Sequence, residues 1–485
     1  MPRRPMRIPE TQGAELRAAL RALRGELGLP GAFPPPVLAE AEAVAAHHRP
    51  LPDLADATDI PLFTIDPPGS KDLDQAMFLA LRPGGGFRIH YAIADVAAFV
   101  VPGGALDTEA HRRVLTYYFP DGRIPLHPDV LGEDAASLLP DRDRPALLWQ
   151  FDLDDFGELV FAHVRRALVR SRARLDYAGV QREIDSGAAE EPLSLLRDIG
   201  RLREELERAR GGISLLVPEQ RIEPHGDGYA LAYQAPLPAE SWNAQLSLMT
   251  GMAAADLMLT AGTGILRTLP AAPSGAVGRL RRVAAALDVD WPHGTSYAEV
   301  VRSLDPARPQ HAAFLQECTA LLRGAGYTAF DGDPPDRARA QHAALADDYA
   351  HCTAPLRRLA DRYTGELCLA AADGAEPPEW VRAALTALPG EMAAGAARAN
   401  EAERECVDLV EAAVLHHRVG EVFDGYVVDV REDEPTRGTV HLYDPAVVGR
   451  VDADPAGPPL PLGHRLRVRV LAADPGRAKV RFAPA

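Results

Sequence analysis

Apolar residues recur at helical spacing in five stretches of the chain. The first two, residues 14 to 27 and about 36 to 47, are separated by the helix breaker LPGAFPPP. Together they predict a short helical module in residues 1–50. This module is either of the helix-turn-helix type or an arm that only packs on the next domain. The same period predicts three further helices, at 192–209, 241–267 and roughly 377–418.

Short apolar strands replace this helical pattern in two regions. After residue 50 the segments FTI, AMFLAL and FRIHYAIADVAAFV alternate with turns, which predicts a large α/β region over residues 51–415. In residues 416–485 the segments GEVFDGYVVDV, GTVHLYD, VVGRVDA and HRLRVRVLAAD alternate in polarity between Gly, Pro and Asp turns, the pattern of a small closed β-barrel. A chain of 485 residues has the length of about three domains. We therefore predict a multi-domain α+β protein.

The last predicted strands carry an excess of basic residues. Between Gly463 and Ala485 there are six basic side chains and one acidic side chain. In RLRVRV the arginines occupy alternate positions, so they share one face of a strand. This face is either a charged stripe for a phosphate backbone or a solvated outer face. The three arginines of the stripe are Arg465, Arg467 and Arg469.

Composition limits the classes of protein to consider. The formal net charge of −17 argues against a nucleic-acid partner, although net charge hides its distribution. Nearly all basic residues are arginine, which suits bidentate phosphate contacts, but a GC-rich coding bias would give the same composition. The four cysteines form no CxxC pair, so neither a zinc knuckle nor a disulfide framework is indicated. The basic, proline-broken start is unlike a signal peptide and no apolar run approaches the roughly 18 residues of a membrane span. We expect a soluble, cytoplasmic protein.

The stretch FTIDPPGSKDLDQA contains three aspartates, Asp66, Asp72 and Asp74, just after a strand-like segment. Like charges held close repel one another unless a cation or a proton compensates them. Carboxylate clusters with open positions suit Mg²⁺, which usually binds one or two carboxylates together with water and substrate phosphate. The spacing fits neither a calcium loop nor a P-loop. The alternative is an acidic surface turn in which the aspartates cap local backbone groups.

This stretch resembles the signature of the ribonuclease II family (RNB domain), whose members hydrolyse RNA from the 3′ end. The resemblance covers roughly residues 50 to 410 and implies an RNB-type catalytic domain followed by a C-terminal OB-fold. Five more segments look like landmarks of the same domain in the same order: YAIADVAAFV (91–100), TYYFPDGRIPLHP (116–128), SRARLDYAGVQ (171–181), HCTAPLRRLADR (351–362) and AERE (402–405).

The resemblance implies roles for individual side chains. Asp66 and Asp72 would help to hold Mg²⁺ and its water, and Asp74 would be the carboxylate most directly tied to catalysis. Arg357 would bind the scissile phosphate, where its planar guanidinium suits the non-bridging oxygens. Tyr118 would stack on the terminal nucleotide, a contact that tolerates any base. The remaining positions implied near the bound RNA are Tyr177, Arg358 and Glu403.

The chain departs from the family pattern at two places. Members of the family usually have a fourth aspartate after Asp74, where this chain has Gln75, whose amide oxygen can ligate a metal but carries no charge. The usual pair of N-terminal cold-shock domains is absent from residues 1–50. A shorter helical start suggests the hypothesis of a wider entrance that admits duplex RNA.

We therefore expect a Mg²⁺-dependent, sequence-independent 3′ to 5′ exoribonuclease that releases nucleoside 5′-monophosphates. Its partner would be the 3′ end of single-stranded RNA, with no membrane or nucleotide cofactor, and the protein would be a monomer. The alternative is a catalytically weak RNA-binding or regulatory protein that has lost efficient catalysis because Gln75 replaces the usual aspartate. A DNA-directed nuclease is a third interpretation, which competition between RNA and DNA oligomers would test.

Overall fold

A long strand organises the sheet of the central body. In the order β2-β9-β3-β4-β5-β8, strand β9 (Leu159–Leu175) pairs with β3 through Ser171 to Leu175 and with β8 through its preceding residues. Strands β3, β4, β5, β8 and β9 therefore form a closed ring of neighbours. The other strands are β2 (Ala55–Asp56), β3 (Leu62–Ile65), β4 (Gln75–Leu81), β5 (Phe87–Ala94) and β8 (Asp143–Leu153).

The alternation of side chains along these strands shows where the main hydrophobic core lies. Met77 and Leu79 of β4 point to the same face as Tyr91 of β5 and as Trp149 and Phe151 of β8, and all five are buried in one apolar cluster. This face is covered by helices α4 (Tyr177–Ser186), α5 (Glu191–Arg210), α6 (Pro238–Ala261), α11 (Leu359–Ala372) and α12 (Glu379–Ala384).

Two predicted helices differ from their pattern: one ends earlier and the other is divided. Gly262 adopts the left-handed conformation (φ 81°) and terminates α6, and Thr263–Thr268 then forms strand β12, which pairs with β13 (Gly326–Asp331). The prediction of one helix over 241–267 was therefore wrong at its end. The run at 377–418 is divided by a break between α12 and α13 (Leu388–Leu415), which has Pro389 in its first turn and is followed by the 3₁₀ turn η4 (His416–Arg418).

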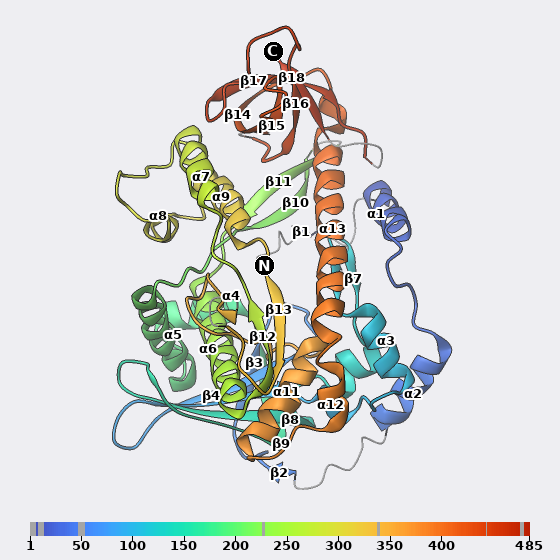
Figure 1. The fold of residues 1–485 in the computed structure, drawn as a ribbon, viewed down its shortest axis with the longest axis vertical. Coiled ribbons are helices and arrows are strands. Elements are labelled where there is room, and N and C mark those ends of the chain that lie inside the picture. The colour runs from blue at the N-terminus through green and yellow to red at the C-terminus, as the bar shows by residue number, and fades with distance from the viewer. Residues whose placement is uncertain are drawn as a thin grey trace.

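Both predicted N-terminal helices are present, α1 (Ala14–Glu26) and α2 (Pro35–Ala46). They take different partners: α1 packs against α13, whereas α2 packs against α3 (Ala105–Arg113). Figure 1 shows them at separate places along the same side of the molecule. This arrangement is that of an arm packed on the body. Strand β1 (Met6–Arg7) joins the hairpin of β10 (Glu219–His225) and β11 (Gly228–Gln234).

A helical insertion between β12 and β13 was not predicted. It consists of α7 (Ser274–Ala286), α8 (Tyr297–Ser303), α9 (Pro309–Cys318) and η3 (Thr319–Leu322). Its core includes Val283 and Phe314 together with Tyr426 and Val428 from the C-terminal barrel. The insertion therefore supports the barrel from one side, while α13 reaches it from the other (Figure 1).

The predicted C-terminal barrel is confirmed. Its strands close in the order β14-β15-β16-β18-β17. They are β14 (Val422–Val430), β15 (Arg437–Leu442), β16 (Val448–Asp452), β17 (Arg465–Ala472) and β18 (Arg481–Pro484).

The computed structural model describes residues 6–7, 14–46, 54–225, 228–336, 340–442, 444–475 and 480–485. Arg477 and Lys479, two of the six basic residues predicted on the last strands, lie outside these ranges. In the described part of the chain, no helix combines the length and apolar character needed to cross a membrane. The small remaining elements are β6 (Tyr117–Phe119), β7 (Gly122–Ile124), η1 (Val96–Ala98) and the π-helical turn η2 (Leu131–Ala135).

Candidate active site

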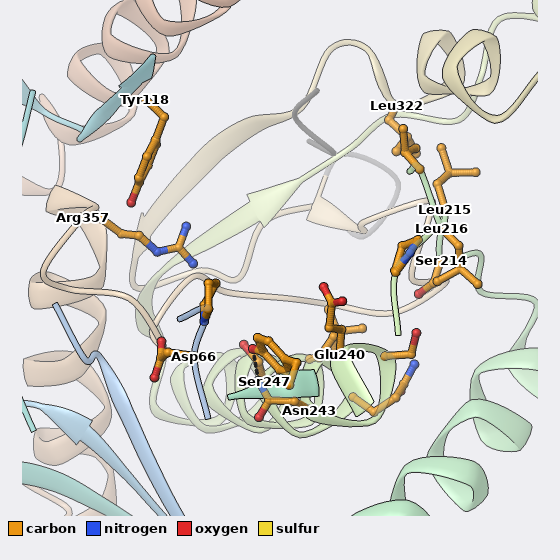
Figure 2. A pocket seen from close by; sticks show the side chains of 18 of the residues that line it. Asp66, Tyr118, Ser214, Leu215, Leu216, Glu240, Asn243, Ser247, Leu322 and Arg357 are labelled. Carbon is orange, nitrogen blue, oxygen red and sulfur yellow. Dashed lines mark hydrogen bonds between the residues drawn. The ribbon is translucent and has the colours of Figure 1, made fainter. Parts of the chain in front are cut away.

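A cavity of about 1970 Å³ lies between the central body and the helical insertion. Its wall includes the loop between β3 and β4, the hairpin β6–β7, one side of α6 and the segment from His342 to Arg357. In Figure 2, Asp66, Tyr118 and Arg357 lie at one end, Glu240, Asn243 and Ser247 lie along α6, and Leu215, Leu216 and Leu322 form the other end. The cavity thus joins a charged end to an apolar end.

The loop that carries the three aspartates, residues 66–74, is fixed at both ends by backbone pairing. The Asp66 amide donates to the carbonyl of Leu175 at 3.1 Å, and the Asp74 carbonyl accepts from the amide of Ala94 at 2.9 Å. Between them, the Leu73 side chain is fully buried and its amide donates to Ser137 Oγ at 2.9 Å. Because neighbouring side chains in an extended segment alternate, burial of Leu73 directs Asp72 and Asp74 to the opposite side, where both line the cavity.

Asp74 and Arg357 face each other at the charged end. Only 6 % of Asp74 is exposed, and its Oδ1 accepts from the amide of Leu356 at 2.8 Å while its Oδ2 lies 3.6 Å from Nε of Arg357. Burial raises the pKa of the Asp74 carboxyl to about 8, although Arg357 and the Leu356 amide oppose the rise. Burial also raises the pKa of Asp66 to about 6, helped by the nearby Asp72 carboxylate. These carboxylates are thus incompletely compensated by the protein itself.

Asp72 has a protein counter-ion. Its Oδ2 pairs with the guanidinium of Arg123, which also pairs with Glu133. Arg123 belongs to β7, so the pair ties the aspartate loop to the hairpin β6–β7. The sequence pattern did not identify Arg123, because its partner lies in a distant part of the chain.

Gln75 is engaged at both ends of its amide. Its Nε2 donates to the carbonyl of Thr353, and its Oε1 accepts from the hydroxyl of Tyr91 at 2.9 Å. The Thr353 hydroxyl in turn hydrogen-bonds Ser247 Oγ of α6 at 2.8 Å. Gln75 therefore connects β4 to the segment that carries Arg357.

The two tyrosines implied near the RNA both line the cavity. Tyr118, which is 41 % exposed, extends from β6 with its hydroxyl toward Arg357 (Figure 2). The backbone relates these residues, since the Thr116 amide donates to the Arg357 carbonyl at 3.1 Å. Tyr177 opens α4, and its hydroxyl accepts from Nδ2 of Asn243 at 2.9 Å. Asn243 Oδ1 is buried and has no partner among the described residues, so this amide is a further candidate for substrate contact that the sequence did not indicate.

The other predicted RNA contacts lie elsewhere. The guanidinium of Arg358 is directed to both oxygens of Asp361, at 2.9 and 2.7 Å, and Arg358 is outside the described wall of the cavity, as is Glu403 on α13. On β17 the three arginines of the stripe are exposed and alternate with partly or fully buried residues, as predicted. Arg465 pairs with Asp288 at 2.6 Å, and Arg467 approaches Asp424 at 4.0 Å.

The donor chemistry of the charged end fits a hard divalent cation. No group of three or more His, Cys, Asp or Glu side chains among the described residues is placed to hold a metal ion by itself. Mg²⁺ characteristically uses only one or two carboxylates and completes its shell with water and phosphate oxygens. Asp66 and Asp74 both line the cavity, whereas Asp72 is bound by Arg123. The cavity leaves room for the remaining ligands.

Comparison with known proteins defines the class. The profile of the RNB domain matches residues 54–371, and that of the RNase II-type exonuclease C-terminal S1 domain matches residues 421–485. The chain therefore belongs to the RNB family, and the expected RNB-type domain and OB-fold are both confirmed.

Several named proteins are similar to this chain. Ribonuclease R of Escherichia coli is 29 % identical over 481 residues, which cover 88 % of this chain and 57 % of the relative. The exosome complex exonuclease dis3 of Schizosaccharomyces pombe is 28 % identical over 322 residues, covering 63 % of this chain and 33 % of the relative. The chain thus spans less than two thirds of the length of these relatives.

Solved structures show the same fold. RNase R of Mycoplasma genitalium, in complex with ribose-methylated single-stranded RNA, superposes with a TM-score of 0.81 at 17 % identity, covering 97 % of this chain and 78 % of the other. Yeast Ssd1, described as a pseudonuclease, superposes with a TM-score of 0.66 at 16 % identity, covering 84 % of this chain and 52 % of the other. The same fold is therefore found in a ribonuclease and in a pseudonuclease.

Proposed function

We propose that this protein is a hydrolytic 3′ to 5′ exoribonuclease that uses Mg²⁺, acts on single-stranded RNA without regard to sequence and releases nucleoside 5′-monophosphates. One observation carries the proposal: a buried carboxylate, Asp74, faces Arg357 on the wall of a large cavity, with Asp66 and Tyr118 at the same end. Membership of the RNB family supports this assignment.

Different residues of the cavity would contribute to different requirements of phosphodiester hydrolysis. Bound Mg²⁺ would be held by Asp66 and Asp74 and would supply an activated water and neutralise charge on the phosphate. Arg357 donates two parallel hydrogen bonds to the non-bridging oxygens of the scissile phosphate, where negative charge increases during the reaction. The Leu356 amide holds Asp74 in place by its 2.8 Å hydrogen bond. Tyr118 stacks on the terminal base, which aligns the last phosphodiester with Arg357.

The cavity suits a chain of several nucleotides. Tyr118 offers an aromatic surface at the charged end, Tyr177 lines the same cavity, and the apolar wall of Leu215, Leu216 and Leu322 continues away from the cleavage position. None of these contacts reads the hydrogen-bonding edge of a base, as a sequence-independent enzyme requires. The protein is expected to act as a monomer in the cytoplasm and to need no nucleotide cofactor.

The direct test uses 5′-labelled single-stranded RNA with and without Mg²⁺, beside an Asp74→Asn variant. Asn keeps the size of the side chain and the hydrogen bond from the Leu356 amide but removes the charge. The proposal expects stepwise shortening from the 3′ end that disappears without Mg²⁺ and in the variant. Endonucleolytic products, or preferential cleavage of a matched DNA oligomer, would contradict it.

Gln75 is the observation that favours a second candidate, an RNA-binding protein with little catalytic activity. A neutral amide stands where the family usually has a carboxylate, and its hydrogen bonds to Tyr91 and Thr353 serve the framework of the site. The second candidate expects wild-type protein and Asp74→Asn to bind RNA equally and to leave it intact. Activity that appears only in Gln75→Asp would establish that this position limits the chemistry.

A further inference from the structure

The hairpin β6–β7, residues 117–124, is too small to hold its own conformation. Each of its strands has three residues, and an isolated two-stranded hairpin is at best marginally stable in water. It nevertheless carries Tyr118, which must lie at a fixed height above the terminal base if it is to stack. The position of Tyr118 therefore depends on what supports the hairpin from outside.

Alternation along β6 separates a supporting face from a working face. Tyr117 and Phe119 are buried, whereas Tyr118 between them is exposed to the cavity. Tyr117 and Phe119 belong to the apolar cluster that contains Leu16, Leu20 and Leu23 of α1. These leucines recur at the spacing of one helical face, so the apolar stripe of α1 and the back of the hairpin belong to one cluster, which also includes residues of α13.

Arg24 adds a polar contact to this packing. Its guanidinium pairs with the carboxylate of Asp121, at the turn of the hairpin, and its Cζ lies 4.3 Å from the centre of the Phe119 ring. The Asp121 side chain is only 6 % exposed, so this buried carboxylate needs its counter-ion. On the opposite flank, Arg123 connects the hairpin to Asp72 of the aspartate loop. The hairpin is therefore held between the N-terminal helix and the catalytic loop.

We propose that α1 is a brace for the hairpin β6–β7 and that Arg24 is a positioning residue, which through Asp121 and Phe119 sets Tyr118 against the 3′-terminal base. The inference rests on the proposed function, because it assumes that Tyr118 stacks on RNA. The N-terminal arm would thus contribute to the active site. Arg17 of α1 lines the cavity beside the hairpin, and Arg24 supports the hairpin from the side away from the cavity.

The test follows stacking directly and without cleavage. A single-stranded RNA with 2-aminopurine at its 3′ terminus is bound in the presence of EDTA, and quenching of the fluorophore measures its stacking on Tyr118. Total affinity is followed separately by anisotropy of a 5′ label. The variants are Arg24→Ala, Arg24→Lys, Tyr118→Ala and, as a matched control, Arg21→Ala, an exposed arginine one turn earlier on the same helix.

If α1 braces the hairpin, Arg24→Ala and Tyr118→Ala should each lose at least half of the quenching seen with wild type. The total affinity of Arg24→Ala for RNA should change less than about 3-fold. Arg24→Lys should recover part of the quenching, and Arg21→Ala should match wild type. In Mg²⁺, Arg24→Ala should lower kcat more than it raises KM, because the terminal phosphodiester loses its alignment with Arg357 while the rest of the cavity still binds the RNA.

The possible outcomes distinguish failure of the brace from failure of the stacking role of Tyr118. Wild-type quenching in Arg24→Ala together with weakened quenching in Tyr118→Ala would overturn the brace and leave the proposed function standing. Unchanged quenching in Tyr118→Ala would instead remove the stacking role that the brace assumes, while the cleavage test with Asp74→Asn would still decide the proposed function. If Arg24→Ala does not fold, Asp121→Asn breaks the same pair from the hairpin side with little change in size, and the same quenching criteria apply to it.

Discussion

The aspartate loop, residues 66–74, and the arginine stripe of the barrel both concentrate charge of one sign, but the fold treats them in opposite ways. Asp74 is buried and its pKa is raised to about 8. The side chains of Arg465 and Arg467 are 68 % and 73 % exposed and lie within reach of Asp288 and Asp424. Water and neighbouring carboxylates satisfy the stripe, whereas burial disfavours the charged form of Asp74 and the protein only partly offsets this. A buried carboxyl with a perturbed pKa on a cavity wall is therefore the stronger indication of chemistry.

The largest effect is expected at the residue that faces this charge. Arg357→Ala should lower kcat by about 10²- to 10³-fold, because it removes donors from the phosphate oxygens on which charge develops. Arg357→Lys should recover only part of this activity, since an ammonium cannot reproduce the planar pair of donors. Single-turnover cleavage of 5′-labelled RNA measures both, and equal rates for the Lys variant and wild type would show that charge alone is needed.

A smaller effect is expected where the loop does have a partner. Arg123→Gln should lower the free energy of unfolding by about 1–3 kcal/mol, because Asp72 then remains in a partly buried site without its counter-ion. The double variant Arg123→Gln with Asp72→Asn should regain at least half of this stability. Denaturant unfolding of the metal-free proteins gives both free energies. An unchanged unfolding midpoint in Arg123→Gln would show that the Arg123–Asp72 pair contributes as little to stability as the exposed ion pairs of the barrel.

The smallest effect is expected from the stripe itself. Replacing Arg465, Arg467 and Arg469 together by Ser should weaken RNA binding only a few-fold. The slope of log affinity against log salt should become shallower by about 0.7 for each phosphate that the barrel no longer neutralises. Arg431→Ser, an exposed arginine elsewhere on the barrel, is the control. An unchanged salt slope in the triple variant would identify the stripe as a solvated outer face.

The sequence pattern was sufficient to predict those elements and site residues whose neighbours in the sequence are also their neighbours in the fold. The strands of the body, the N-terminal helices and the barrel follow from periodicity, because each buries one face. The aspartate loop was recognisable from its motif, since Asp66, Asp72 and Asp74 lie within one short segment. The end of α6 was mispredicted because apolar residues continue past Gly262 into a strand whose partner, β13, lies beyond the helical insertion.

Contacts between distant segments could not be predicted in this way. Arg123 is an ordinary arginine in the sequence and becomes part of the site only when β7 meets the aspartate loop. Asn243 similarly depends on α6 crossing the start of α4. Arg358 was selected because it adjoins Arg357, but the turn into α11 directs its guanidinium to Asp361. A motif identifies the segment, while the fold decides which of its side chains reach the cavity.

Helix α13 has a mechanical consequence for the whole molecule. Its 28 residues make a rod about 42 Å long that runs from the catalytic body to the barrel. Such a rod fixes orientation as well as distance, because each residue adds about 100° of rotation and 1.5 Å of rise. A single residue inserted into its exposed middle would turn the barrel away from the helical insertion on which it rests. The central body and the barrel would thereby lose their alignment, so the length of this helix determines how the two are oriented relative to each other.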